Sequence, residues 1–228
     1  MKLREKNLKI LKNNHVYSEE MEHDACGVGV IVSTEGKKSR TIVEYGIEAL
    51  KAVWHRGAVD ADGKTGDGAG IHLEIPKDFF IEKIEVTGHE HDNSEICVGM
   101  IFLPRNDYSA QETCKTIVES ELTKNNFSIY GWRQVPVNPK ILGEKAFQTM
   151  PEIMQVLFKS NDKNLLDKNL ERKIYETRKK IENKAFQLSL NNFYICSISS
   201  KSIIYKGLYL AEGISDFYLD LKDKRFES

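Results

Sequence analysis

The chain has 228 residues, with 33 basic and 34 acidic side chains and a formal net charge of −1. This near balance of positive and negative charge does not favour nucleic acid or an anionic membrane as a partner. No apolar run approaches the ~20 residues of a transmembrane helix. The length fits one large domain, or a domain with a tail. The basic N-terminus lacks the apolar stretch of a secretory signal, so the cytoplasm is the expected location.

The four cysteines of the chain are Cys26, Cys97, Cys114 and Cys196. They are widely spaced and include no Cys-x-x-Cys pair. This spacing fits neither a zinc site nor a small disulfide scaffold, and it is typical of a protein from a reducing compartment. We therefore expect no metal site, and a redox or metal-binding function is disfavoured.

Cys26 marks the boundary between two kinds of sequence. Residues 1–25 are polar and charged without strong periodicity, and we interpret them as a leader. In the stretch Cys26–Val32, every residue after the cysteine is apolar or glycine, and this pattern predicts a buried strand. If the chain is cut before Cys26, its thiol and a free α-amino group belong to one residue. With an unperturbed pKa of roughly 7.7–8.0, that amine can serve as base for its own thiol. The alternative interpretation is a small buried cysteine that opens a core strand.

A turn at 33–36 and an amphipathic helix at 40–55 are predicted next, with Gly57 as the stop of the helix. The stretch 60–70 then carries four glycines and three aspartates. Its spacing matches neither a phosphate-binding loop, because Ala58 stands where the first glycine is needed, nor an EF-hand loop. So many glycines suit a loop wrapped around a site, although an ordinary surface loop remains the alternative.

The rest of the chain alternates predicted strands and helices, and this pattern alone also allows a doubly wound parallel sheet. Ser109 is the expected N-cap of a helix at 110–122. The charged helix at 165–188 has an apolar face formed by Leu170, Ile174, Ile181 and Phe186. The strands at 193–199 and 202–210 are predicted to form a hairpin. The remaining expected elements are strands at 71–75 and 96–103, one or two strands at 127–137, a short apolar run at 151–158 and a short helical segment at 214–221.

Several motifs together resemble the amino-terminal glutaminase domain of glutamate synthase large subunits, a class II glutamine amidotransferase of the N-terminal-nucleophile hydrolase superfamily. The glycine-rich loop with its Gly-Lys-Thr-Gly-Asp-Gly core makes the resemblance specific. The resemblance extends from Cys26 to the end of the chain. The matching stretches are Cys26-Gly27-Val28-Gly29, His55-Arg56-Gly57-Ala58, 61–70, 133–137, 193–195, 205–207, 217–218 and 225–228.

The resemblance implies an α+β fold, a four-layer αββα sandwich of antiparallel sheets that is incomplete at the C-terminus. Residues 1–25 would be a propeptide, and 26–228 the amino-terminal portion of the amidotransferase domain. Cys26 would attack the side-chain amide of glutamine, and Arg56 would hold the Cys26 segment in place; its alternative role is to complement a helix dipole. No cofactor is implied for this segment. The full-length enzyme would use FMN, an iron–sulfur cluster and NAD(P)H or ferredoxin, with a possible small subunit, for ammonia assimilation into glutamate.

The chain also departs from the family pattern. It contains no Asn-Gly pair for the oxyanion hole, and each lost oxyanion donor costs on the order of 10²–10³ in rate. We therefore expect the 228 residues alone to hydrolyse glutamine weakly or not at all. A catalytically incomplete module that only docks onto a synthase core is the alternative from another functional class.

Overall fold

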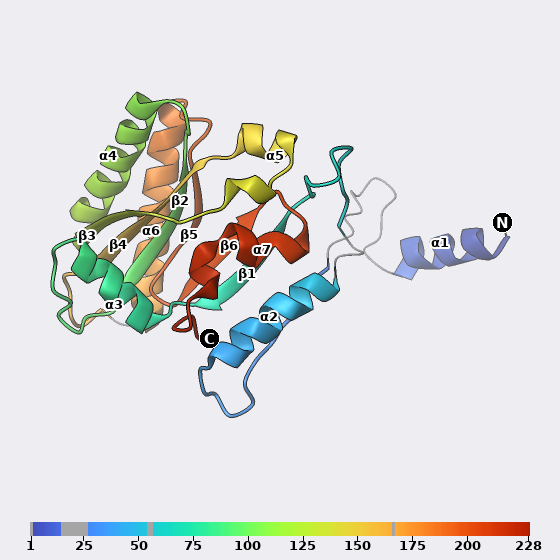
Figure 1. Ribbon diagram of the computed structural model, residues 1–228, viewed down its shortest axis with the longest axis horizontal. Helices are drawn as coiled ribbons and strands as arrows, with labels where there is room; N and C mark the ends of the chain where they lie inside the picture. The colour runs from blue at the N-terminus through green and yellow to red at the C-terminus, as the bar shows by residue number, and fades with distance from the viewer. Residues whose placement is uncertain (1, 15–26, 54–56, 166) are drawn as a thin grey trace.

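The computed structural model describes residues 2–14, 27–53, 57–165 and 167–228 (Figure 1). The elements, in chain order, are α1 (Lys2–Asn14), α2 (Arg40–Ala52), β1 (Ala69–Glu74), α3 (Lys77–Val86), β2 (Cys97–Leu103), α4 (Tyr108–Lys124), β3 (Phe127–Gln134), α5 (Glu144–Thr149), β4 (Glu152–Ser160), α6 (Asp167–Gln187), β5 (Tyr194–Ser199), β6 (Ser202–Gly207) and α7 (Ile214–Phe217). Short 3₁₀ turns lie at Pro139–Ile141, Ala211–Gly213 and Leu219–Lys222. No helix in these ranges is both long enough and apolar enough to cross a membrane.

A four-stranded antiparallel sheet with the order β3-β4-β2-β5 forms the larger half of the molecule. The long helices α4 and α6 pack beside each other against one of its faces (Figure 1). Alternate residues of β2, including Ile101 and Leu103, point to this side and share a core with Val118 of α4 and Ile174 of α6. The two helices and the sheet therefore bury one another's apolar surfaces.

The second sheet is a ribbon of two antiparallel strands, β1 and β6. Its Leu73 and Tyr205 belong to the same apolar core as Val98 and Met100, which lie on the face of β2 turned away from α4 and α6. Helix α2 packs along β1 and adds Val43 to this core. The fold is thus mixed α and β with antiparallel sheets, and the parallel arrangement that the pattern also allowed does not occur in the described part of the chain.

A buried ion pair connects the 3₁₀ turn Leu219–Lys222, the last turn named above, to the larger sheet. The Arg133 guanidinium on β3 donates two hydrogen bonds, of 2.8 and 2.9 Å, to the two carboxylate oxygens of Asp220, and a third of 2.6 Å to Gln155 on β4. The Tyr205 hydroxyl donates to the same carboxylate at 3.1 Å. Only 3% of the Asp220 side chain and 13% of the Arg133 side chain are exposed. These bonds replace the water that both charges lose on burial.

The hairpin predicted for 193–210 is wrong, because its two strands do not pair with each other. β5 and β6 follow each other through a tight turn, but β5 pairs with β2 and β6 pairs with β1. Glu171 of α6 holds the turn, because its carboxylate accepts bonds from the Ser199 hydroxyl and from both the amide and the hydroxyl of Ser200. The chain therefore crosses at this point from one sheet to the other.

Other local expectations also need correction. The buried strand predicted for Cys26–Val32 is not formed over residues 27–32, which are exposed and belong to no strand; 85% of Val28 is exposed. A strand needs a neighbour for its backbone hydrogen bonds, and no described strand pairs with this segment.

Helix α2 ends at Ala52, well before Gly57. The N-cap of α4 is Asp107, whose side chain accepts from the Ala110 amide at 2.9 Å, and not Ser109. Phe186 is 86% exposed and lies off the buried face of α6.

Three helices were not expected from the sequence pattern: α1, α3 and α5. α1 lies at the edge of the molecule beyond the sheets (Figure 1), and its apolar side chains Leu3, Ile10 and Leu11 are exposed. α3 is short but buries Phe79, Phe80 and Ile84 in the core beside the ribbon. α3 and α5, with ten and six residues, are too short for a periodic pattern to distinguish them from irregular chain.

Candidate active site

A hollow of about 540 Å³ lies where the end of α2, the glycine-rich loop and the start of the segment after β6 meet. The loop supplies five of the fourteen lining residues, and the segment between Tyr209 and Glu212 supplies four more. Its lining residues are Gly27, Leu50, Val53, Gly57, Val59, Gly63, Asp67, Gly68, Ala69, Gly70, Tyr209, Leu210, Ala211 and Glu212. The volume is within the range of small-molecule sites.

The glycine-rich loop is held in a defined shape by its own hydrogen bonds. The Asp60 amide donates to the Thr65 carbonyl at 2.8 Å, and a bridge joins Val59 to Gly66. The Asp62 carboxylate accepts from the Thr65 hydroxyl at 2.6 Å and from the Thr65 and Lys64 amides at 2.7 and 2.9 Å. The sequence motif therefore encodes a closed turn, with Asp62 as its organising side chain.

Two close contacts place this loop against the rest of the fold. A Cβ atom on Gly66 would lie 2.5 Å from the carbonyl oxygen of Tyr209, so only glycine lets the loop meet the segment after β6. On the other side, Lys145 of α5 pairs with Asp60 at 2.7 Å, and the Ala146 amide donates to the Thr65 hydroxyl at 3.4 Å. The wall of the hollow is thus built from contacts between distant parts of the chain.

Gly143, just before α5, is a sensitive point of this arrangement. An added Cβ would overlap the carboxylate of Asp62 and the hydroxyl of Thr65 and would lie 2.6 Å from the Thr65 amide. Because φ at Gly143 is −71°, alanine is allowed by the backbone and only the overlap opposes it. We expect Gly143→Ala to lower the free energy of unfolding by roughly 1–3 kcal/mol, measured by urea denaturation. Gly29→Ala, with nothing within 4 Å of the added methyl group, is the matched control. An equal effect of the two substitutions would contradict the packing argument.

The turn also makes a prediction about pH. Hydrogen bonds from the Thr65 hydroxyl, and then from the Thr65 and Lys64 amides, lower the pKa of Asp62 to about 2. A depressed folded-state pKa stabilises the turn fully above the unfolded value of roughly 3.9, and this contribution is lost as the pH falls through about 2. A carboxyl NMR titration should therefore show Asp62 ionised at pH values where most aspartates are protonated. Thr65→Val should raise its pKa; an unchanged titration in this variant would contradict the assigned cause.

The sequence-predicted site residues Cys26 and Arg56 both lie outside the described residues, as does His55. Their neighbours in the sequence are described. Gly27 follows Cys26, Val53 precedes the His-Arg pair and Gly57 follows it, and all three line the hollow. Sequence reasoning missed the wall from Tyr209 to Glu212, since no periodic or motif signal relates that segment to the loop.

The other three cysteines are unsuited to nucleophilic chemistry. Cys97, Cys114 and Cys196 are buried and form no disulfide. Burial raises the pKa of Cys114 and Cys196 to about 11 and that of Cys97 further still. At neutral pH these thiols keep their protons, whereas the thiolate is the reactive form.

Residues 26–228 match the family model of class-II glutamine amidotransferases. The chain therefore belongs to this family. It is 53% identical over 222 residues, 97% of its length, to "Glutamate synthase [NADPH] large chain" of Azospirillum brasilense, of which it covers 15%. It is 39% identical over 209 residues, 91% of its length, to "Ferredoxin-dependent glutamate synthase 1, chloroplastic/mitochondrial" of Arabidopsis thaliana, of which it covers 13%. The chain thus spans only 13–15% of the length of these relatives.

Proposed function

We propose that this chain is the glutaminase part of a glutamate synthase and releases ammonia from the side-chain amide of glutamine. The observation that carries the proposal is the family match over 26–228, which begins at Cys26. The hollow supports it, because Gly27, Val53 and Gly57, which are close to Cys26, His55 and Arg56 in the sequence, all line it. The glycines of that wall let a small polar ligand approach the backbone closely.

In the proposed reaction the Cys26 thiolate attacks the amide carbon of glutamine. The α-amino group of the same residue takes the thiol proton and returns it to the departing nitrogen, so that ammonia leaves and a thioester remains. Water then adds to the thioester carbon and expels the thiolate, which releases glutamate. Each step needs Cys26 as the first residue, because only then is its nitrogen an amine and not an amide.

For Arg56 we propose a positioning role, in which it holds the Cys26 segment beside the hollow. Its competing role was to complement the dipole of the preceding helix. Helix α2 ends at Ala52, four residues earlier, and the dipole effect fades beyond the last turn. The end of the helix therefore favours the positioning role.

We propose residues 1–25 as a propeptide and 26–228 as the amidotransferase portion. The exposed side chains of α1 support this division, since the core contains none of its described residues and its removal would leave the packing intact. We also propose the four-layer αββα sandwich as the architecture of the complete domain. The support for it is that α4 and α6 cover one face of the larger sheet while the ribbon and α2 lie towards the other.

In the full-length protein, we propose that the ammonia aminates 2-oxoglutarate in the cytoplasm. FMN, an iron–sulfur cluster and NAD(P)H or ferredoxin would serve that reaction in other domains, and a small subunit is a further possible partner. The names of the two relatives, one a glutamate synthase [NADPH] and the other a ferredoxin-dependent glutamate synthase, support this context.

Mass spectrometry of the purified protein tests the proposal. We expect a mass that corresponds to loss of residues 1–25, and a covalent adduct on Cys26 after treatment with a diazoketone analogue of glutamine. An uncut chain with an unreactive Cys26 would contradict the hydrolase and favour a module that only docks onto a synthase core. Peptide mapping assigns the adduct to one of the four cysteines.

A further inference from the structure

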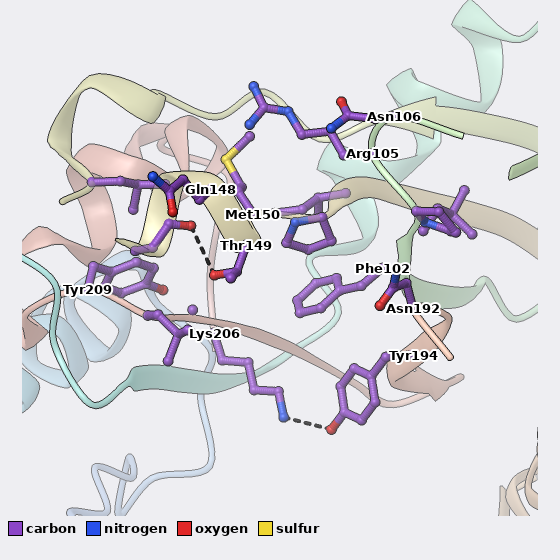
Figure 2. Close-up of a pocket in the computed structure, with 18 of the residues that line it drawn as sticks. Phe102, Arg105, Asn106, Gln148, Thr149, Met150, Asn192, Tyr194, Lys206 and Tyr209 are labelled. Carbon is purple, nitrogen blue, oxygen red and sulfur yellow. Dashed lines mark hydrogen bonds between the residues drawn. The ribbon is translucent and has the colours of Figure 1, made fainter. Parts of the chain in front are cut away.

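A second pocket, larger than the hollow, opens at one end of the two sheets (Figure 2). Its volume is about 690 Å³, and it is walled by the end of β2, the start of β4 and β5, the end of β6 and helix α5. We call it the inter-sheet pocket and define it by Phe102, Met150, Tyr194, Lys206 and Tyr209, which lie in these elements or just after them. Its size suits a small molecule, and the proposed amidotransferase chemistry makes no use of it.

Tyr209 carries an unmet hydrogen-bonding group in this pocket. The residue is only 1% exposed, and its hydroxyl has no hydrogen-bond partner among the described residues. Figure 2 shows the phenol ring of Tyr209 in the pocket wall, with its oxygen on the side of the other lining residues. The neighbouring Tyr218 is equally buried, but its hydroxyl donates to the Lys206 carbonyl at 2.8 Å. Buried polar groups are normally bonded, so an unpaired one in a pocket wall indicates a missing partner.

The charge around the pocket favours an anion. Arg105 and Lys206 both line it, and neither forms an ion pair with a carboxylate in the described part of the chain. Lys206 donates to the Tyr194 hydroxyl at 2.6 Å, and Arg105 donates to the Phe147 carbonyl at 3.2 Å, so both cations are held by neutral acceptors. The one acidic residue of the lining, Asp107, is engaged as the N-cap of α4.

The remaining wall combines apolar and neutral polar side chains. Phe102, Met150 and Phe217 supply an apolar part that belongs to, or packs against, the core between the sheets. The polar part consists of Asn106, Gln148, Thr149, Asn191 and Asn192. A ligand that fills this space buries apolar surface, which favours binding. Burial also raises the pKa of Tyr209 far above its ordinary value, so its hydroxyl keeps the proton and can donate it to an acceptor.

We propose that the inter-sheet pocket binds a small carboxylate with an apolar body. The carboxylate accepts a hydrogen bond from Tyr209 within the positive potential of Arg105 and Lys206, and the apolar body lies against Phe102 and Met150. Because the hydroxyl is covered in the structure, the ligand reaches it after a small rotation of lining side chains, as is common on binding. The inter-sheet pocket and the hollow meet at Tyr209, which lines both, but carboxylate binding uses none of the proposed chemistry at Cys26.

Phenylacetate is a suitable probe, with phenylacetamide as its uncharged analogue. In an NMR titration of the full chain, we expect saturable shifts at the pocket residues with phenylacetate and clearly weaker binding of the amide. Tyr209→Phe should weaken phenylacetate binding by about tenfold, since it removes one hydrogen bond to a charged group. Cys26→Ser should bind the probe as the wild type does, which separates this test from the glutaminase proposal.

Tyr218→Phe is the matched control, because its hydroxyl is already bonded within the protein. It should leave probe binding unchanged and lower the thermal midpoint, since the Lys206 carbonyl loses its donor. Tyr209→Phe should leave the midpoint unchanged or raise it, because it removes an unpaired polar group. Lys206→Met provides a second variant that should weaken the carboxylate more than the amide. The proposal is overturned if phenylacetate gives no saturable shifts, if Tyr209→Phe binds it equally well, or if Tyr209→Phe destabilises the protein as Tyr218→Phe does.

Discussion

Cys26→Ser is expected to abolish covalent labelling by a diazoketone analogue of glutamine, with a fall in rate on the order of 10³-fold or more. The serine hydroxyl has nearly the same size but ionises far less readily than a thiol, so the amine beside it generates almost no anion at neutral pH. Labelling is measured from the intact mass over time. The same spectra show whether residues 1–25 are still attached in the variant.

Cys196→Ser is the matched control for this experiment. Its thiol donates to the Ile204 carbonyl at 3.5 Å, and burial raises its pKa to about 11, so it is not expected to react. The control should label at the wild-type rate, provided that its thermal midpoint shows a folded protein. Labelling that survives in Cys26→Ser and disappears in Cys196→Ser would move the nucleophile away from residue 26 and refute the proposed function.

Asp220→Ala is expected to be the most damaging substitution for stability, with a loss of roughly 3–5 kcal/mol in the free energy of unfolding. Without the carboxylate, the Arg133 guanidinium stays buried with only Gln155 as a described side-chain hydrogen-bond acceptor, and the Tyr205 hydroxyl loses its acceptor. Removing one member of a buried pair leaves the full desolvation cost of the other. Urea denaturation followed by circular dichroism measures the change.

An exposed ion pair gives the comparison. Lys37 and Glu35 lie 2.8 Å apart with both side chains largely in solvent, and Glu35→Ala should cost less than about 1 kcal/mol. The double substitution Arg133→Met with Asp220→Leu should recover part of the loss, because it removes both buried charges. If Asp220→Ala proves as mild as Glu35→Ala, the pair is not the anchor between the last turn and the sheet.

Local sequence patterns predicted most of the regular elements correctly. The strand at 97–103 and the long helix at 167–187 fall within two residues of their expected limits, and the buried residues of α6 include the predicted Leu170, Ile174 and Ile181. Such elements are encoded in the chain itself, since an apolar period of about two or of 3.6 residues specifies which face is buried. The motifs around Cys26, His55 and the glycine-rich loop also indicated the family, which the family match confirms.

What the sequence by itself determined is therefore the set of elements, the motifs and the family to which they belong. The tertiary structure alone decided that β5 and β6 lie in different sheets, that the loop at Asp62 packs on Gly143, and that Arg133 meets Asp220 across 87 positions of the chain. It also left residues 27–32 exposed, although their composition is that of a core strand. The physical reason is that periodicity records only which face of an element is apolar. The partner that covers that face depends on how distant segments pack together.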